Sequence, residues 1–170
     1  MRRCSSEPTT GDSAAHTFAR SVKGRVAALA RAHTLLAGGR WCGTDLRAVI
    51  EGALAPFLGR PGAGSNATLE GPPVALGPAA VQALSMALHE LATNAAKYGA
   101  LSRPEGRLAV TWALGSPDLD ESRPALLLGW KETGGPAVPA RPARRGFGGT
   151  VVEATIARQL GGEVAAEWHS

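Results

Sequence analysis

Residues 78–98 predict a long helix whose two sides differ in chemistry, and no other segment constrains the fold as strongly. At roughly 100° per residue, four apolar side chains fall within one narrow arc that suits burial: Leu84, Leu88, Leu91 and Ala95. Glu90, Asn94 and Lys97 fall within a second arc, and their i, i+4, i+7 spacing makes them neighbours along the helix surface. The helix therefore needs a core on one side and carries a polar stripe on another.

The polar stripe combines a carboxylate, an amide and an ammonium group on one rigid face. Hard oxygen ligands suit Mg²⁺, which keeps several waters and takes few protein ligands, so such a face could hold Mg²⁺ and the phosphates bound to it. A polar stripe at helical spacing more often faces solvent, so the stripe alone does not establish a site. Other segments have to support it.

Composition excludes several classes of function. The net charge of +4 is spread over separate arginines with no basic run longer than a pair, and the chain has one Tyr and three Phe, so a nucleic-acid surface is not expected. Cys4 and Cys42 are the only cysteines, which implies neither a disulfide framework nor a metal site. The N-terminus lacks the apolar core of a signal peptide, and no apolar run is long enough for a membrane segment, so a cytoplasmic location is expected.

The first third of the chain predicts helices. Residues 1–13 are expected to be a disordered tail, and residues 14–58 a helical segment. Within it, a helix over residues 14–37 has apolar residues recurring near one side: Phe18, Val22, Leu29 and Leu36. A second helix, capped by Thr44 or Asp45, is expected to run to about Leu58. Gly and Pro in residues 59–66 mark a flexible connection.

From residue 67 the pattern changes to mixed helix and strand, so the fold class is predicted to be α+β. Strands are expected at residues 67–70, 74–76, 107–114, 125–131 and 163–168. Pro78 suits the first turn of the long helix, and Gly99 stands where a left-handed cap would end it. A last helix is expected from Gly148 or Gly149 to about Leu160.

Two glycine-containing segments could complete a site with the polar stripe. In residues 130–136 a strand leads to Glu132 and then two glycines, and a carboxylate there could accept a hydrogen bond from an exocyclic amine of a ligand. Residues 144–150 form a basic, Gly-rich loop that opens a helix, where backbone amides and the helix dipole favour phosphate. Taken singly, each is also compatible with an ordinary hairpin end or loop, and no Walker-type phosphate loop occurs.

Three motifs nevertheless occur in a distinctive order. The first is His89-Glu90-Leu91-Ala92-Thr93-Asn94-Ala95-Ala96-Lys97-Tyr98-Gly99-Ala100, the second is Trp130-x-Glu132, and the third is Arg145-Gly146-Phe147-Gly148. Their order and spacing resemble the HWE family of bacterial histidine kinases, named for a His and a Trp-x-Glu that are filled here by His89, Trp130 and Glu132. The resemblance extends upstream through residues 28–36 and 41–46.

The resemblance implies a Bergerat-type ATP-binding domain over residues 67–170, an α/β sandwich of a mixed sheet with helices on one face, with ATP and Mg²⁺ as cofactors. It implies that Asn94 coordinates Mg²⁺, that Glu90 is the base or positions a water at the metal, and that Lys97 contacts phosphate. Glu132 would take the adenine-reading place. The other nucleotide-binding positions implied are Gly134, Gly146, Gly148 and Thr150.

The phosphoacceptor histidine is not identified, because the family's acceptor box and the helix that carries it have no counterpart. His16 and His33 are expected to be structural or solvated, and His89 is expected to be a structural hydrogen-bonding residue. The helical segment 14–58 would correspond to part of the dimerisation region.

The sequence therefore predicts a histidine kinase module of two-component signalling that transfers the ATP γ-phosphoryl group to a histidine supplied in trans. The alternatives are a non-catalytic ATP-binding or docking module, and a serine kinase of the anti-sigma-factor type. Expected partners are ATP, a response regulator or histidine-containing protein, and a second copy of the chain in a homodimer.

Overall fold

The computed structural model describes residues 10–38, 44–58, 66–115, 125–137 and 147–167. Its helices are α1 (Thr10–Gly38), α2 (Leu46–Leu54), α3 (Pro78–Tyr98), η1 (Ala100–Ser102, a 3₁₀ turn) and α4 (Phe147–Leu160). Its strands are β1 (Thr44–Asp45), β2 (Ala67–Glu70), β3 (Ala75–Leu76), β4 (Arg107–Gly115) and β5 (Ala125–Thr133). The fold is α+β, as predicted, with a helical segment before the main sheet.

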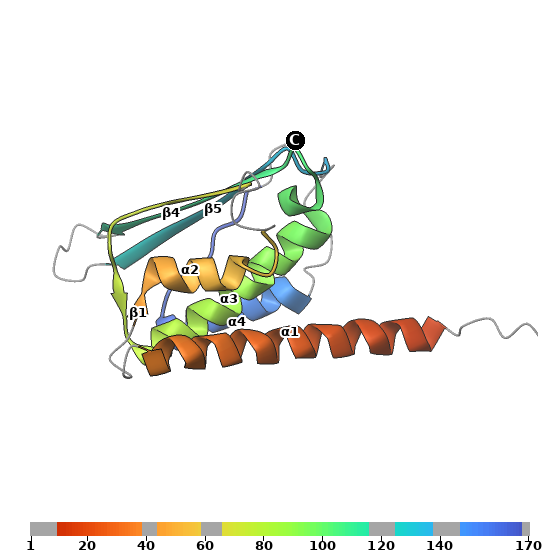
Figure 1. The fold of residues 1–170 in the computed structure, drawn as a ribbon, viewed down its shortest axis with the longest axis horizontal. Helices are drawn as coiled ribbons and strands as arrows, with labels where there is room; N and C mark the ends of the chain where they lie inside the picture. The colour runs from red at the N-terminus through yellow and green to blue at the C-terminus, as the bar shows by residue number, and fades with distance from the viewer. Residues whose placement is uncertain (1–9, 39–43, 59–65, 116–124, 138–146, 168–170) are drawn as a thin grey trace, which may run out of the picture.

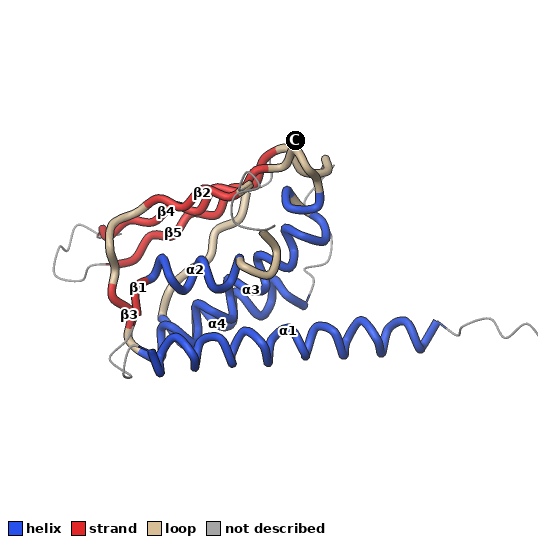
Figure 2. The backbone as a smooth tube through the Cα atoms, viewed as in Figure 1, coloured by secondary structure: helices blue, strands red, loops and turns tan. Residues whose placement is uncertain are grey.

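The main sheet is mixed and has the order β2-β4-β5, with β2 parallel to β4 and β4 antiparallel to β5. The short strands β1 and β3 form a separate antiparallel pair. Helices α2, α3 and α4 lie on one face of the main sheet, and α1 runs along the far side of the helical layer (Figure 1, Figure 2). The N-terminal end of α1 extends beyond the other helices and strands in this view (Figure 1).

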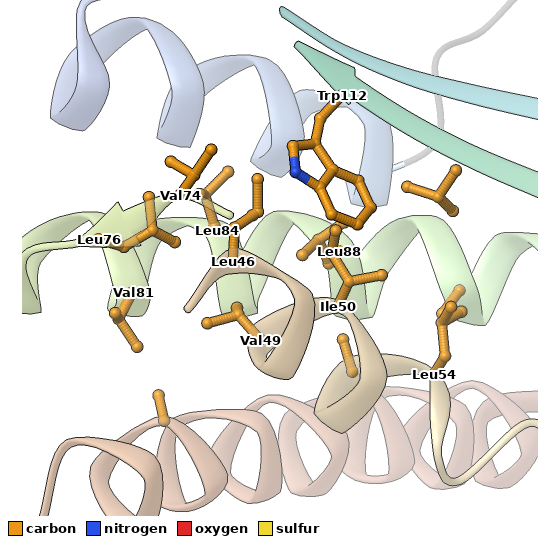
Figure 3. Close-up of a cluster of buried hydrophobic side chains, with 14 of the residues drawn as sticks. Leu46, Val49, Ile50, Leu54, Val74, Leu76, Val81, Leu84, Leu88 and Trp112 are labelled. Atoms are coloured by element: carbon orange, nitrogen blue, oxygen red, sulfur yellow. The ribbon is translucent and has the colours of Figure 1, made fainter. Parts of the chain in front are cut away.

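The core lies between the sheet and the helices (Figure 3). Asp45 caps α2 by accepting a 2.7 Å hydrogen bond from the Arg47 backbone N–H. This start places Leu46, Ile50 and Leu54 on the buried face of α2, where each is fully buried. Trp112 of β4 packs into the same cluster from the sheet side. These contacts fix α3 against the sheet, and α3 carries the polar stripe.

Helix boundaries differ modestly from the prediction. Helix α1 begins at Thr10, four residues before the expected start, and α2 ends at Leu54, before the expected Leu58. Residues 1–9 lie outside the described residues, so the predicted tail stays a prediction there. The predicted starts of α3 at Pro78 and of α4 near Gly148 are confirmed, the latter within one residue.

The side of α1 that packs on the protein is not its large apolar side. Val22 and Leu29 are 40% and 36% exposed, whereas Ala28 and Ala32 are buried. The side chains of Phe18 and Leu36 lie outside the described residues. Small residues allow two helices to approach closely, and this approach brings α1 against α3.

Two predictions about secondary structure are wrong, one about a helix cap and one about a strand. Gly99 does not form a left-handed cap: its backbone is extended (φ −113°, ψ −154°), and its N–H bonds to the carbonyls of Asn94 and Ala95 at the end of α3. Residues 163–167 form no strand, because they make no ladder with any described strand. Gly161, at φ +65°, turns the chain after α4, which ends at Leu160 as expected.

Candidate functional site

The polar stripe of α3 lies between two other helices. Glu90 is 6% exposed, and its Oε1 accepts a 2.7 Å hydrogen bond from Nε of Arg25 on α1, so the two side chains form an ion pair. Its other oxygen, Oε2, faces the start of α4: a Cβ built on Gly148 would lie 2.8 Å from it. The Glu90 carboxylate is thus enclosed by α1 on one side and by α4 on the other.

Asn94 lies one turn further along α3 on the same side. A Cβ on Gly148 would lie 3.5 Å from Asn94 Nδ2 and 3.6 Å from Oδ1, so the lack of a side chain at Gly148 lets the start of α4 approach Glu90 and Asn94 closely. Lys97, the third member, is exposed, as is Thr150 on the first turn of α4. The predicted convergence of the α3 stripe with the glycines that open α4 is therefore present in the geometry.

Glu132 of β5 lies against the C-terminal end of α3. Its Oε2 accepts a 2.8 Å hydrogen bond from the Ala100 backbone N–H, and its Oε1 accepts a 2.9 Å bond from the Trp130 indole N–H. A Cβ on Gly99 would overlap this carboxylate, so only glycine allows the contact. Trp130 and Glu132 therefore act as a pair that joins β5 to the C-terminal end of α3.

The turn after β5 is held close to the same segment. Gly134 adopts φ +68°, in the left-handed region that favours glycine. A Cβ on Gly135 would lie 2.9 Å from the Ala100 N atom, so the turn backbone packs directly on the start of η1. Glycine at both positions allows the sheet to approach the end of α3.

His89, the residue before Glu90, packs under α1. Its residue is 7% exposed, its ring centroid lies 5.8 Å from that of Phe57, and a Cβ on Gly24 would lie 2.7 Å from its Nε2. Burial, and then the positive charge of Arg31, hold the pKa of His89 below its usual 6.5. Its Nδ1 is buried without a hydrogen-bond partner. Among the described residues, the hydrogen bond that the sequence predicted for His89 is therefore not found at Nδ1.

Some predicted residues cannot be placed, and two contacts were not predicted. Gly146 lies outside the described residues, as do Arg144 and Arg145. Sequence reasoning missed Arg25 and the contact of Gly24 with His89, because each partner is 65 residues away along the chain and no local pattern marks such a pairing. His33, on α1, is exposed and lies near Gln82 of α3.

The part of the chain that the structure describes lacks two features. Within it, no three His, Cys, Asp or Glu side chains form a cluster that could hold a metal by themselves. No helix there has the length and apolar character needed to cross a membrane.

The chain is similar to known proteins over most of its length. A family model described as HWE histidine kinase matches residues 6–73. A protein of Rhizobium johnstonii named blue-light-activated histidine kinase is 38% identical over 154 residues, which cover 89% of this chain and 41% of that protein. Proteins of the same name from Brucella ovis and Brucella abortus are each 37% identical over 136 residues, covering 80% of this chain and 27% of the relative.

The chain spans less than half the length of these relatives. An alignment that covers 89% of the chain necessarily includes α3 and β5, which carry His89, Trp130 and Glu132. The family model and the alignments thus cover both the N-terminal helices and the candidate site. The chain belongs to the HWE family of histidine kinases.

Proposed function

We propose that this chain is the ATP-binding and phosphotransfer module of a two-component histidine kinase, with a Bergerat-type fold, and that it transfers the γ-phosphoryl group of Mg-ATP to a histidine supplied in trans. The single observation that carries the proposal is the meeting of three segments around α3. Glu90 and Asn94 face Gly148 at the start of α4, and Glu132 is bonded to Ala100 just beyond the end of the same helix.

Asn94 and Glu90 have the donor set expected around Mg²⁺ that remains largely hydrated. An amide oxygen would bind the ion directly, and a carboxylate would bind it through water, which suits the small number of protein ligands that Mg²⁺ takes. Gly148, which has no side chain, places the start of α4 close to both groups. Mg²⁺ bound with ATP would supply charge neutralisation at the phosphates.

Several described groups would favour phosphate binding next to this pair. Lys97 and Thr150 are exposed on α3 and α4, and they would contact the phosphates directly. The first amides of α4 lack helical partners and carry the positive end of the helix dipole. The chain's role in catalysis is then mostly positioning and electrostatic stabilisation, as is general for phosphoryl transfer.

Glu90 would act as the base. The acceptor imidazole nitrogen forms a bond to the γ-phosphorus, the bond from phosphorus to the bridging oxygen breaks, ADP leaves, and the imidazole proton passes to the Glu90 carboxylate. Glu132 would sit at the adenine end, where its carboxylate accepts from an exocyclic amine. Its present bonds to Ala100 and Trp130 use one lone pair on each oxygen, so acceptor capacity remains.

Titration calorimetry with Mg-ATP tests the binding half of the proposal. Asn94→Ala should weaken the affinity by about tenfold or more, as loss of a metal ligand or its support does. Gln82→Ala is the matched control, because it removes an amide from the same helix near His33, away from Glu90. The proposal fails if the wild-type chain does not bind Mg-ATP, or if Asn94→Ala binds as tightly as the wild type.

Labelled ATP tests the transfer half. A form of the Rhizobium johnstonii relative inactivated by replacing the residue aligned to Asn94 serves as acceptor protein. Acid-labile label on that acceptor supports histidine phosphorylation, whereas acid-stable label would favour the serine-kinase alternative. Binding of Mg-ATP without any transfer would favour a non-catalytic module, an alternative consistent with the ion pair that occupies Glu90.

A further inference from the structure

Helix α1 covers the carboxylate that the proposed function needs for catalysis. Arg25 donates from Nε to Glu90 Oε1 at 2.7 Å, and the two side chains are only 18% and 8% exposed. A hydrogen bond between ionised groups that are largely shielded from water is among the stronger polar contacts in a protein. The start of α4 faces the second oxygen, Oε2, so among the described residues Arg25 and Gly148 lie against the two oxygens of Glu90.

The position of Arg25 bears on the proposed proton transfer to Glu90. A base that accepts a proton from an imidazole must first accept a hydrogen bond from its N–H group, at about the same heavy-atom distance of 2.6–3.2 Å. The guanidinium Nε–H of Arg25 occupies that place on Oε1. The guanidinium group of arginine keeps its protons in proteins, so it occupies the acceptor's position on Oε1 without transferring a proton to Glu90.

A second contact fixes the register of α1 on α3. Gly24, next to Arg25, lies so close to His89 that a Cβ there would approach Nε2 to 2.7 Å. His89 cannot easily yield, because its ring is buried and packs against Phe57. Ala28 and Ala32 continue the same side of α1 as buried small residues. The close fit at Gly24 therefore holds Arg25 opposite Glu90.

From these contacts we propose that α1 is an autoinhibitory helix of this module: Arg25 occupies the acceptor's place on Glu90, and α1 must leave α3 before a phosphoacceptor can enter. This inference rests on the proposed function and names the regulation of its site. It assigns to Gly24 and His89 the role of a docking contact and to Arg25 that of an internal substitute for the acceptor N–H.

The test compares two variants of the full chain that loosen this contact by different means. Arg25→Met keeps most of the aliphatic stem but removes the N–H and the charge. Gly24→Ala keeps Arg25 and pushes α1 away from His89. Lys23→Met is the matched control, because it removes one positive charge from an exposed position of the same helix.

Two readouts are measured: hydrogen exchange of the α1 amides, and the rate of transfer of labelled phosphate from ATP to the inactivated Rhizobium johnstonii relative. Both loosening variants should exchange faster in α1 and transfer phosphate about tenfold faster than the wild type, within the usual range for coupling between a regulatory contact and a site. Lys23→Met should match the wild type in both.

The failure of this inference is distinct from failure of the proposed function. If the wild type transfers phosphate and the two variants exchange faster in α1 but transfer no faster, α1 does not inhibit and the inference is overturned. A loss of transfer in Arg25→Met with faster exchange would overturn it as well, since Arg25 would then support catalysis. Absence of Mg-ATP binding by every form would instead refute the proposed function.

Discussion

A single methyl group added at Gly99 should separate Glu132 from the end of α3. A Cβ there would overlap Oε2 of Glu132 and lie 2.9 Å from its carboxyl carbon and 3.0 Å from the Ala95 Cα. The carboxylate can rotate away, whereas the α3 backbone cannot. The substitution Gly99→Ala is therefore expected to break the 2.8 Å hydrogen bond from the Ala100 N–H to Glu132.

The cost can be worked out from three contributions. Ala100 is fully buried, so its N–H would lose its partner without gaining water, at a cost of about 1–3 kcal/mol. The backbone at Gly99 is extended and acceptable to alanine, and the stiffer unfolded chain returns about 0.4–1 kcal/mol. Glu132 is exposed, so its charge adds little. The net prediction is a loss of about 0–2.6 kcal/mol in the free energy of unfolding, with a central value of about 1.3 kcal/mol.

Urea unfolding followed by circular dichroism measures this loss. Gly149→Ala is the control: nothing lies within 4 Å of a Cβ at that helical position, so it should gain about 0.5–1 kcal/mol instead. In a double-mutant cycle, the costs of Gly99→Ala and Glu132→Ala should not add, because each removes the same hydrogen bond. Full additivity, or a Gly99→Ala chain at least as stable as the wild type, would refute the reasoning.

Three other predictions concern the site and the core. Gly148→Ala should weaken Mg-ATP binding by about tenfold in calorimetry, since its Cβ would crowd Glu90, while helix propensity offsets the cost to folding. Burial in the folded chain lowers the pKa of His89 below the 6.5 of the unfolded chain. The contribution of His89 to stability is therefore complete above about pH 6.5 and declines as the pH falls from there through the folded pKa. His89→Gln should flatten this dependence in urea unfolding from about pH 8 to about pH 5. Ile50→Ala, at a fully buried position, should cost about 2–5 kcal/mol, whereas Val26→Ala, at a position 61% exposed, should change the unfolding free energy by less than about 0.5 kcal/mol.

Local sequence signals predicted most elements of the fold because the physics behind them is local. Asp45 caps α2 because its carboxylate reaches an amide two residues away. The apolar spacing from Leu46 to Leu54 predicts the buried face of α2 without reference to any other element. The alternating pattern of β4 likewise gives its buried side directly. The strand prediction for residues 163–167 was wrong because a strand forms only beside a partner strand, and the composition of the segment does not show whether one is present.

Gly99 shows how a correct signal can receive the wrong explanation. Glycine after a helix usually marks a left-handed cap, so the sequence pointed to backbone conformation. The observed φ of −113° needs no glycine, and the constraint comes instead from the carboxylate of Glu132, 33 residues further along the chain. Glycine is required at position 99 because a Cβ would overlap the Glu132 carboxylate, and this neighbour is visible only in the folded structure.

The packing of α1 was the hardest feature to predict, for a reason that bears on the site. Hydrophobic periodicity assigns burial to the side with the largest apolar residues, yet Val22, Val26 and Leu29 stay exposed and Ala28 and Ala32 are buried. Large side chains would hold two helices further apart, toward the upper end of the usual 8–10 Å between axes. At that separation, Arg25 could reach Glu90 only with its side chain extended outward. Burial of the small side gives up apolar area on α1 and brings the guanidinium to 2.7 Å from the carboxylate, so the choice of face and the contact at Glu90 have the same physical origin.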